Sequence, residues 1–142
     1  MKRIAILNGP NLNLLGTREP EVYGDKTLQD LEAEWVAFGE VNGVEITCFQ
    51  SNVEGELIDA IQAHGFDADA ILINPGGYTH TSVAIRDSIA AVDAPVFEVH
   101  ISHPDAREEF RKTSLVREVC AGGVSGLGIQ GYTAVLESLI TG

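Results

Sequence analysis

The sequence has 142 residues, of which 9 are Lys or Arg and 21 are Asp or Glu, so its formal net charge is −12. A chain this acidic lacks the basic face that phosphate neutralisation requires, which argues against nucleic acids and anionic membranes as partners. The length predicts a single domain over residues 1–142 with a sizeable core. No apolar run approaches the roughly 18 residues of a membrane span, and the run that follows Met1 is too short for a signal peptide. Cys48 and Cys120 lie in apolar stretches, so we expect buried thiols in a cytoplasmic protein.

Short apolar runs alternate with amphipathic segments along the chain. The apolar runs predict strands buried in a parallel sheet, at residues 3–7, 44–49, 70–73 and 96–101, with a weaker fifth near 116–124. Hydrophobic residues at helical spacing predict helices over residues 27–39, 54–64, 81–92 and 129–140. Ser51 and Glu54 have the spacing of a capping box at the start of the second helix. The alternation predicts an α/β fold, a flavodoxin-like doubly wound five-stranded parallel sheet of order 2-1-3-4-5 with helices on both faces.

Polar, glycine-rich segments follow the predicted strands, at residues 8–13, 50–52, 74–82, 100–104 and 126–132. The carboxyl ends of parallel strands share one edge of the sheet, and ligands bind in the crevice there. Three of the four histidines, His80, His100 and His103, lie in these segments. Turn formation alone explains one or two such loops. Five of them with three histidines favour a binding or catalytic site.

Glu98 and His100 are two residues apart on a predicted strand, so their side chains project to the same face of the sheet. A carboxylate beside an imidazole fixes its tautomer and supports general acid–base catalysis. The alternative is a structural ion pair in the core. The long loop 8–26 carries Tyr23, which acts as a base near neutral pH only if cations stabilise its phenolate. Candidate cations are Arg18 in the same loop and the pair at positions 107 and 111.

Other patterns exclude competing functions. The glycines at 126, 128 and 131 match a dinucleotide fingerprint, but no strand follows them, so we interpret them as close packing at a helix start. No phosphate-binding loop is present, which argues against a noncatalytic nucleotide or small-ligand module. A receiver-type signalling domain would carry paired aspartates after its first strand, where this chain has Asn8 and Asn11. His100 and His103 have no third partner for zinc, so we expect no metal.

Several blocks of the sequence resemble type II 3-dehydroquinate dehydratase, in order and across nearly the whole chain. They include Asn-Gly-Pro-Asn-Leu-Asn at 8–13, Arg-Glu-Pro-Glu-Val-Tyr-Gly at 18–24, Asn-Pro-Gly-Gly-Tyr-Thr-His-Thr-Ser at 74–82 and Glu-Val-His-Ile-Ser at 98–102. The others lie at 50–52, 54–58, 107–111 and 128–132. The resemblance implies a hydro-lyase of the shikimate pathway of aromatic amino-acid biosynthesis. It converts 3-dehydroquinate to 3-dehydroshikimate by anti elimination through an enolate, without metal or cofactor.

The resemblance also implies a role for each matching residue. Tyr23 is the base, Arg18 keeps it ionised, and Asn11 holds a water against the enolate oxygen. His100 protonates the departing hydroxyl, and Glu98 orients His100. The implied substrate-binding residues are Asn74, Gly76, Gly77, His80, Asp87, Ile101, Ser102 and Arg111, with Arg107 in support. Among these, Asp87 is expected to reach the site of a neighbouring subunit, because the family forms homododecamers built as a tetramer of trimers.

Two further expectations concern single residues. His103 stands where the family usually has asparagine, so we expect the geometry of the carboxylate-binding loop to differ there. None of the lysines, Lys2, Lys26 and Lys112, lies inside a predicted strand. The other known mechanism for this dehydration forms an imine between the substrate and a buried lysine. The lysine positions therefore favour the enolate mechanism independently of the resemblance.

Overall fold

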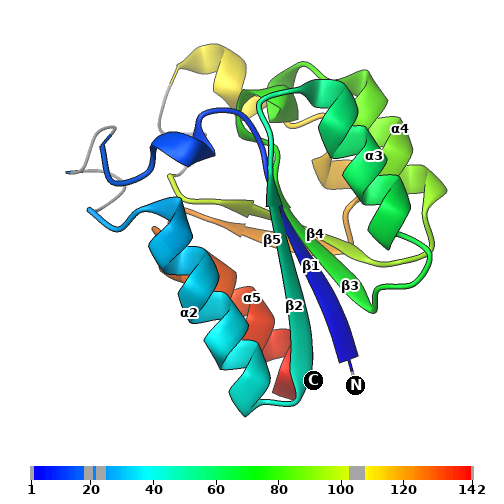
Figure 1. The fold of residues 1–142 in the computed structure, drawn as a ribbon. Coiled ribbons are helices and arrows are strands. Elements are labelled where there is room, and N and C mark those ends of the chain that lie inside the picture. Colours follow the sequence, from blue (N-terminus) through cyan, green and yellow to red (C-terminus); the bar gives the residue numbers. More distant parts are fainter. Residues whose placement is uncertain (1, 18–20, 22–24, 103–107, 142) are drawn as a thin grey trace.

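The computed structural model describes residues 2–17, 21, 25–102 and 108–141 (Figure 1). Its centre is a parallel sheet of five strands in the order β2-β1-β3-β4-β5, as the sequence predicts. The strands are β1 (Lys2–Asn8), β2 (Val44–Gln50), β3 (Ala70–Asn74), β4 (Val96–His100) and β5 (Gly122–Ser125). Neighbouring strands pair in parallel throughout, so all five carboxyl ends open toward the same edge.

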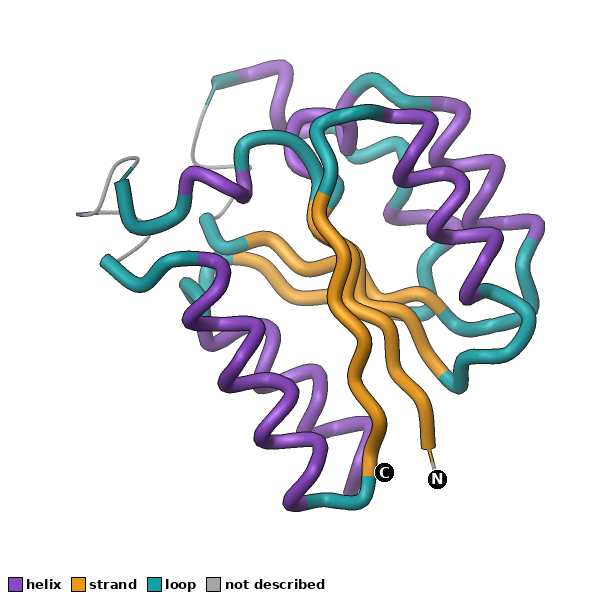
Figure 2. The backbone as a smooth tube through the Cα atoms, in the orientation of Figure 1, coloured by secondary structure: helices purple, strands orange, loops and turns teal. Residues whose placement is uncertain are grey.

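Helices cover both faces of this sheet (Figure 2). On one face lie α2 (Leu28–Val41) and α5 (Gln130–Thr141), and on the other lie α3 (Glu54–His64) and α4 (Val83–Ala91). These four helices confirm the predicted ones, with boundaries shifted by one or two residues. Short 3-10 helices occupy the connections: η1 (Leu12–Leu14), η2 (Gly76–His80), η4 (Glu109–Lys112) and η5 (Arg117–Val119).

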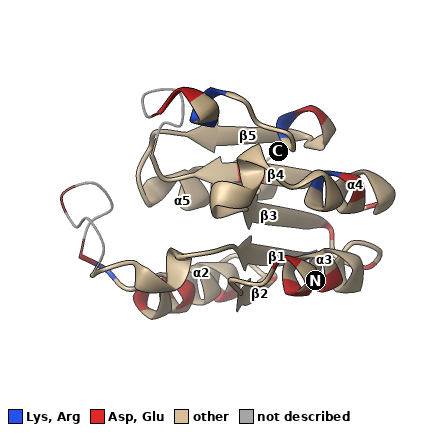
Figure 3. Ribbon diagram, turned by 90° about the horizontal axis from the view of Figure 1, so that it is seen from above, with Lys and Arg blue, Asp and Glu red and all other residues tan. Residues whose placement is uncertain are grey.

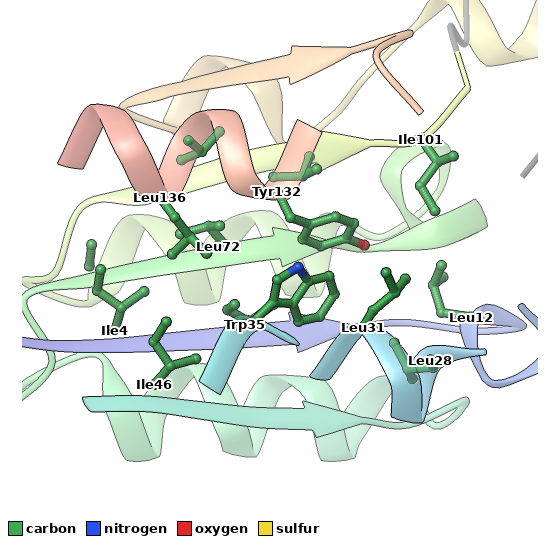
Figure 4. Close-up of a cluster of buried hydrophobic side chains, with 14 of the residues drawn as sticks. Ile4, Leu12, Leu28, Leu31, Trp35, Ile46, Leu72, Ile101, Tyr132 and Leu136 are labelled. Atoms are coloured by element: carbon green, nitrogen blue, oxygen red, sulfur yellow. The ribbon is translucent and has the colours of Figure 1, made fainter. Parts of the chain in front are cut away.

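Two hydrophobic cores, one on each face, follow from the alternation of side chains along the strands. Ile4 and Ile6 of β1 point to the core under α2 and α5, whereas Ala5 and Leu7 point to the core under α3 and α4. Figure 4 shows the first core, in which the rings of Trp35 and Tyr132 meet at a centroid distance of 4.4 Å. That contact joins α2 to α5 on the same face of the sheet.

The predicted capping box at Ser51 and Glu54 is wrong. The residue before α3 is Val53, and no side chain caps that helix. The Ser51 hydroxyl instead accepts a hydrogen bond from the Val53 amide at 2.9 Å, which closes a local turn. Ser51 lies two residues before the N-cap position, Val53, so it does not cap the helix. A capping box does form at the start of α2. There the Thr27 hydroxyl accepts from the Asp30 amide at 3.1 Å, and the Asp30 carboxylate accepts from the Thr27 amide at 3.0 Å.

The fifth strand forms later than predicted, because the segment that follows Val116 turns into η5 before β5 begins. Val116 is fully buried, but it lies in the connection and not in the sheet. Cys48 and Cys120 are only partly buried, and that burial raises the pKa of each thiol to about 12, so both stay protonated. No helix in the described ranges combines the length and apolar character needed to cross a membrane.

Candidate active site

A cavity of about 120 Å³ lies where the carboxyl ends of β1, β3 and β4 meet. Segments far apart in the sequence build its wall, from the loop after β1 to η4. Its lining residues are Pro10, Asn11, Leu12, Asn74, Gly76, Gly77, His100, Ile101, Ser102 and Arg111. All of them except Pro10 and Leu12 belong to the site predicted from the sequence. The parallel sheet therefore gathers most of the predicted site residues that the structure describes at one edge.

The central residue of this wall is His100 on β4, which is paired with Glu98 behind it. Both residues are buried, with side-chain exposures of 5% and 9%, and the His100 Nε2–H donates to Glu98 Oε2 at 2.8 Å. Strand alternation places both on the face that carries α3 and α4, as the two-residue spacing predicts. The bond occupies Nε2 and leaves the other ring nitrogen, Nδ1, for a second partner. A carboxylate in this position fixes the tautomer of an imidazole that acts as an acid.

The Glu98 carboxylate is ionised in this environment. Burial alone would raise the pKa of Glu98, but the hydrogen bond and charge of His100, the Ser114 hydroxyl and the Arg117 guanidinium together outweigh burial and lower it. Ser114 Oγ donates to Glu98 Oε2 at 2.9 Å, and Arg117 Nε lies 3.7 Å from Glu98 Oε1. The pair is thus a charged, hydrogen-bonded unit at the edge of the cavity.

Asn74 at the end of β3 is fixed on two sides. Its Oδ1 accepts from the Gly76 amide at 3.1 Å, and its Nδ2 donates to the Tyr132 hydroxyl at 3.0 Å. The Tyr132 hydroxyl in turn donates to Asn8 Oδ1 at 2.5 Å. Burial raises the pKa of Tyr132, so it remains a neutral phenol. These contacts still leave one N–H of the Asn74 amide for a ligand in the cavity.

The loop after β1 is locked against its neighbours. Asn11 adopts a left-handed conformation with φ of 71°, and its amide donates to Asn52 Oδ1 at 3.0 Å. The Gly9 amide donates to the carbonyl of Asn74 at 2.8 Å. A Cβ on Gly9 would lie 2.6 Å from the carbonyl oxygen of Pro75, so only glycine allows this approach. The Asn11 side chain is therefore presented to the cavity by a rigid turn.

Arg111 brings positive charge to the cavity. Its guanidinium lies 4.9 Å from the centroid of the Phe110 ring and its Nε donates to the Glu108 carboxylate. Figure 3 shows that Asp and Glu positions are spread over the helices, whereas several of the few Lys and Arg positions lie beside β5. A negatively charged ligand at this edge of an acidic protein would meet Arg111 first.

Three predicted site residues that the structure describes do not line the cavity: Glu98, which lies behind His100, and His80 and Asp87. The His80 Nδ1–H donates to the carbonyl of Thr113 at 2.7 Å, and its ring stands edge-on to Phe110 at 6.2 Å. His80 therefore joins η2 to the segment that follows η4. Asp87 is exposed on α4, away from the cavity of its own chain.

The predictions for Arg18, Tyr23, Arg107 and His103 fall outside the described residues. Conversely, Ser114 and Arg117, which contact Glu98, and the role of Tyr132, which holds Asn74, were not predicted from the sequence. No local pattern marks these residues. The contacts depend on how the connection after η4 folds back onto β4 and on a hydrogen bond between positions 8 and 132, which are 124 residues apart.

A carboxylate-oriented imidazole beside a small polar cavity, at the carboxyl edge of a doubly wound sheet, is typical of α/β enzymes that use general acid–base catalysis. Comparison with known proteins agrees. The family model described as dehydroquinase class II matches residues 2–140. A 3-dehydroquinate dehydratase from Bacillus licheniformis is 53% identical over 137 residues, which cover 96% of this chain and 94% of that protein.

Solved structures show the same relationship. A type II dehydroquinase from Propionibacterium acnes superposes with a TM-score of 0.96 at 39% identity, covering 100% of this chain and 98% of that one. One from Butyrivibrio crossotus gives a TM-score of 0.94 at 42% identity, covering 99% and 98%. The chain therefore belongs to the class II dehydroquinase family and is an enzyme of the hydro-lyase class.

Proposed function

We propose that the chain removes water from 3-dehydroquinate to give 3-dehydroshikimate, by anti elimination through an enolate. The observation that carries the proposal is the buried Glu98–His100 pair, bonded at 2.8 Å, whose His100 lines the same cavity as Arg111. A β-hydroxy ketone loses water only if a base takes the proton beside the carbonyl and an acid protonates the departing hydroxyl. The pair supplies the acid.

In the first step, Tyr23 as phenolate takes the proton beside the ketone, and the electron pair moves onto the carbonyl oxygen to form the enolate. Arg18 stabilises the phenolate, and a water held by Asn11 stabilises the enolate oxygen. The roles of Tyr23 and Arg18 rest on the resemblance of the block at 18–24. The position of Asn11 on the cavity wall supports its role.

In the second step, the enolate re-forms the ketone and expels the hydroxyl, which His100 protonates so that it leaves as water. Glu98 stabilises the imidazolium before this transfer and orients the ring during it. Protonated Tyr23 and neutral His100 then exchange protons with solvent, which restores both groups. The step needs no oxidant or reductant, because elimination leaves the substrate's oxidation level unchanged.

The remaining wall of the cavity suits the rest of this substrate. Ile101 and Ser102, at the end of β4, would hold its carboxylate through main-chain amides, with Arg111 nearby. Asn74, Gly76 and Gly77 would contact its hydroxyl groups. His80 and Arg107 would support that side of the site, as the resemblance implies.

The lysine environment favours this mechanism over imine chemistry. Lys26 forms an ion pair with Glu34 at 2.9 Å and Lys112 forms one with Glu109 at 3.1 Å, and the two lysine side chains are 48% and 51% exposed. Lys2 lies at the start of β1, at the opposite end of the strand from the cavity. An imine-forming lysine requires a desolvated position beside the substrate, and none of the three has one.

The test is a spectroscopic assay with purified protein. Addition of 3-dehydroquinate is expected to give new ultraviolet absorbance from the conjugated enone, and absence of any change at micromolar enzyme would overturn the proposed function. Sodium borohydride added with substrate is expected to leave the wild-type enzyme active. Loss of activity with a covalent adduct on a lysine would show that the mechanism is wrong.

The assembly and setting are part of the proposal. Asp87 is exposed and lies away from its own cavity, which supports its predicted reach into a neighbouring site of a homododecamer. Light scattering coupled to size-exclusion chromatography would measure the mass of the particle, and a monomer would contradict this. We place the activity in the cytoplasm and in the shikimate pathway, where the product feeds aromatic amino-acid biosynthesis.

A further inference from the structure

A short connecting segment, residues 114–117, lies behind the acid pair and supplies its remaining contacts. Glu98 Oε2 accepts two hydrogen bonds, from His100 Nε2 at 2.8 Å and from Ser114 Oγ at 2.9 Å. The other oxygen, Oε1, faces Arg117 Nε at 3.7 Å. The carboxylate is therefore held between a ring on its own strand and two side chains from this segment.

The segment is fixed in place by contacts on both sides. Val116 is fully buried in the core under α3 and α4. The Leu115 amide donates to the carbonyl of Thr79 at 2.8 Å, and Arg86 Nη1 donates to the carbonyl of Leu115 at 2.7 Å. These bonds link the segment to η2 and α4. A rigid anchor of this kind lets Ser114 hold the carboxylate at a fixed angle.

Ser114 also connects the two contacts to each other. Its hydroxyl donates to Glu98 and accepts from the amide of Arg117 at 3.1 Å. Loss of the hydroxyl would therefore loosen both the carboxylate and the start of η5. Since the bond from Arg117 to Ser114 uses the main chain, a change of the Arg117 side chain leaves this turn intact.

The electrostatic environment of Glu98 also indicates a role for Ser114 and Arg117. Glu98 is 5% exposed, and a carboxylate buried this deeply needs cationic and hydrogen-bonding partners to stay ionised. Among the residues that the structure describes, the charged or titratable groups around the pair are Arg117 on η5, Arg111 across the cavity and Cys120, whose pKa burial raises to about 12, so that it is a neutral thiol. Arg117 is thus the cation that faces the carboxylate from behind.

Arg117 is reachable from solvent. It lines a second cavity of about 290 Å³ together with Glu98, His100 and the residues of β5. Its side chain is 52% exposed, so salt screens its charge more than it screens the buried pair. This gives the contribution of Arg117 a dependence on ionic strength that Ser114 lacks.

We propose that Ser114 and Arg117 are positioning residues, which keep Glu98 ionised and aligned with His100 and so set the lower pH limit of turnover. The inference rests on the proposed function for its kinetic readout, and it has a second readout that does not. Ser114 acts mainly through alignment and Arg117 mainly through charge. The two residues are therefore expected to change different kinetic quantities.

The kinetic test uses two pairs of variants. Ser114→Ala is expected to lower kcat about tenfold at neutral pH with little change in KM, because the carboxylate loses one of its two aligned donors. Ser114→Thr keeps the hydroxyl and is expected to restore most of kcat. Arg117→Ala is expected to lower kcat only a few-fold at neutral pH but to move the acid limb of the kcat–pH profile upward by roughly half a unit. Arg117→Lys is expected to return that limb toward the wild type.

Lys112→Met is the matched control for charge. The Lys112 side chain is 51% exposed, almost the same as that of Arg117, but its partner is the exposed Glu109 and not Glu98. It removes the same charge from the chain, so an unchanged acid limb is expected. If Lys112→Met moves the limb as far as Arg117→Ala does, the effect belongs to net charge and the inference is overturned.

The second readout is independent of turnover. The titration of the Glu98 carboxyl can be followed by ¹³C NMR in protein labelled at glutamate, with Glu98→Gln used to assign the signal. The midpoint is expected to rise in both Ser114→Ala and Arg117→Ala, and high salt is expected to raise it in the wild type but not in Arg117→Ala. An unmoved midpoint would overturn the inference even in an active enzyme, whereas a risen midpoint in a protein without turnover would leave only the proposed function overturned.

Discussion

The two faces of β4 differ in what they carry, although their residues alternate along one five-residue strand. Phe97, Val99 and Ile101 point to the core under α2 and α5. Glu98 and His100 point to the other side, where they form the buried charged pair. One face therefore packs into the apolar core, and the other carries the pair that we propose as the acid. A parallel strand buried on both sides makes this division possible because side-chain direction changes at every residue.

This arrangement also shows how the sheet positions the Glu98–His100 pair. The apolar residues on one side fix the position of the strand, and the strand fixes the spacing of Glu98 and His100. Tyr132 makes a similar link between core and site at β3, since its ring packs on Trp35 in the apolar core while its hydroxyl bonds Asn74. The apolar core and the cavity are thus connected through the ring and the hydroxyl of Tyr132. Variants can therefore separate effects on stability from effects on activity.

The strongest test of the division is Tyr23→Phe. If the reacting groups come from the loops at the carboxyl edge, loss of the phenolate is expected to lower kcat by about 10³-fold or more. Substrate binding and the free energy of unfolding are expected to stay close to wild type. Turnover in the absorbance assay, calorimetric binding and urea unfolding measure the three quantities. Near-normal turnover would remove Tyr23 from the role of base.

A smaller effect is expected for Tyr132→Phe, which acts where scaffold and site meet. The change keeps the ring against Trp35 but removes both hydrogen bonds of the hydroxyl, which would cost about 1–3 kcal/mol of unfolding free energy. Since the Asn74 side-chain amide loses its bond to the Tyr132 hydroxyl and keeps only the one from the Gly76 amide, KM is expected to rise while kcat changes little. Tyr78→Phe is the control, because the Tyr78 hydroxyl bonds only the exposed carbonyl of Asn52. If the two variants have equal effects in urea unfolding and kinetics, the role of the Tyr132 hydroxyl in holding Asn74 is contradicted.

The smallest effect concerns the pH dependence of stability. Despite burial, the pKa of Glu98 lies below its ordinary value because of its partners. A group with a lowered pKa stabilises the fold above the pKa of the unfolded chain, about 4.3 for glutamate, and the contribution disappears as the pH falls through the folded value. Urea unfolding between pH 7 and pH 3 is therefore expected to show a shallower loss of stability in Glu98→Gln than in the wild type. Parallel curves would show that Glu98 does not contribute.

The fold was largely predictable because it follows from local patterns. The apolar runs and the helical spacing identify the strands and helices, and the family of α/β sheets leaves few possible strand orders. The errors occur where a contact or a turn that the spacing does not reveal overrides a local signal. Ser51 has the spacing of a cap, yet its hydroxyl closes a turn at Val53, and Val116 has the burial of a strand residue without joining the sheet.

The site was predictable in part for the same reason. Glu98 and His100 are neighbours on one strand, so their pairing can be inferred from spacing alone. Ser114 and Arg117 reach the pair through the connection before β5, part of which the sequence pattern wrongly predicts to be a strand. Their contact with Glu98 depends on the burial of Val116 and on bonds to η2, which no local rule supplies. Supporting residues of a site are harder to predict than the residues they support.

The most direct test of the division is a comparison of His100→Ala with Val99→Ala, adjacent residues on opposite faces of β4. Each protein is measured for kcat in the absorbance assay and for unfolding free energy in urea. His100→Ala is expected to lose about 10³-fold in kcat with little loss of stability, whereas Val99→Ala is expected to lose about 2 kcal/mol of stability and to keep its kcat while folded. A His100→Ala enzyme with near-normal turnover, or a Val99→Ala enzyme that is stable but inactive, would contradict the account.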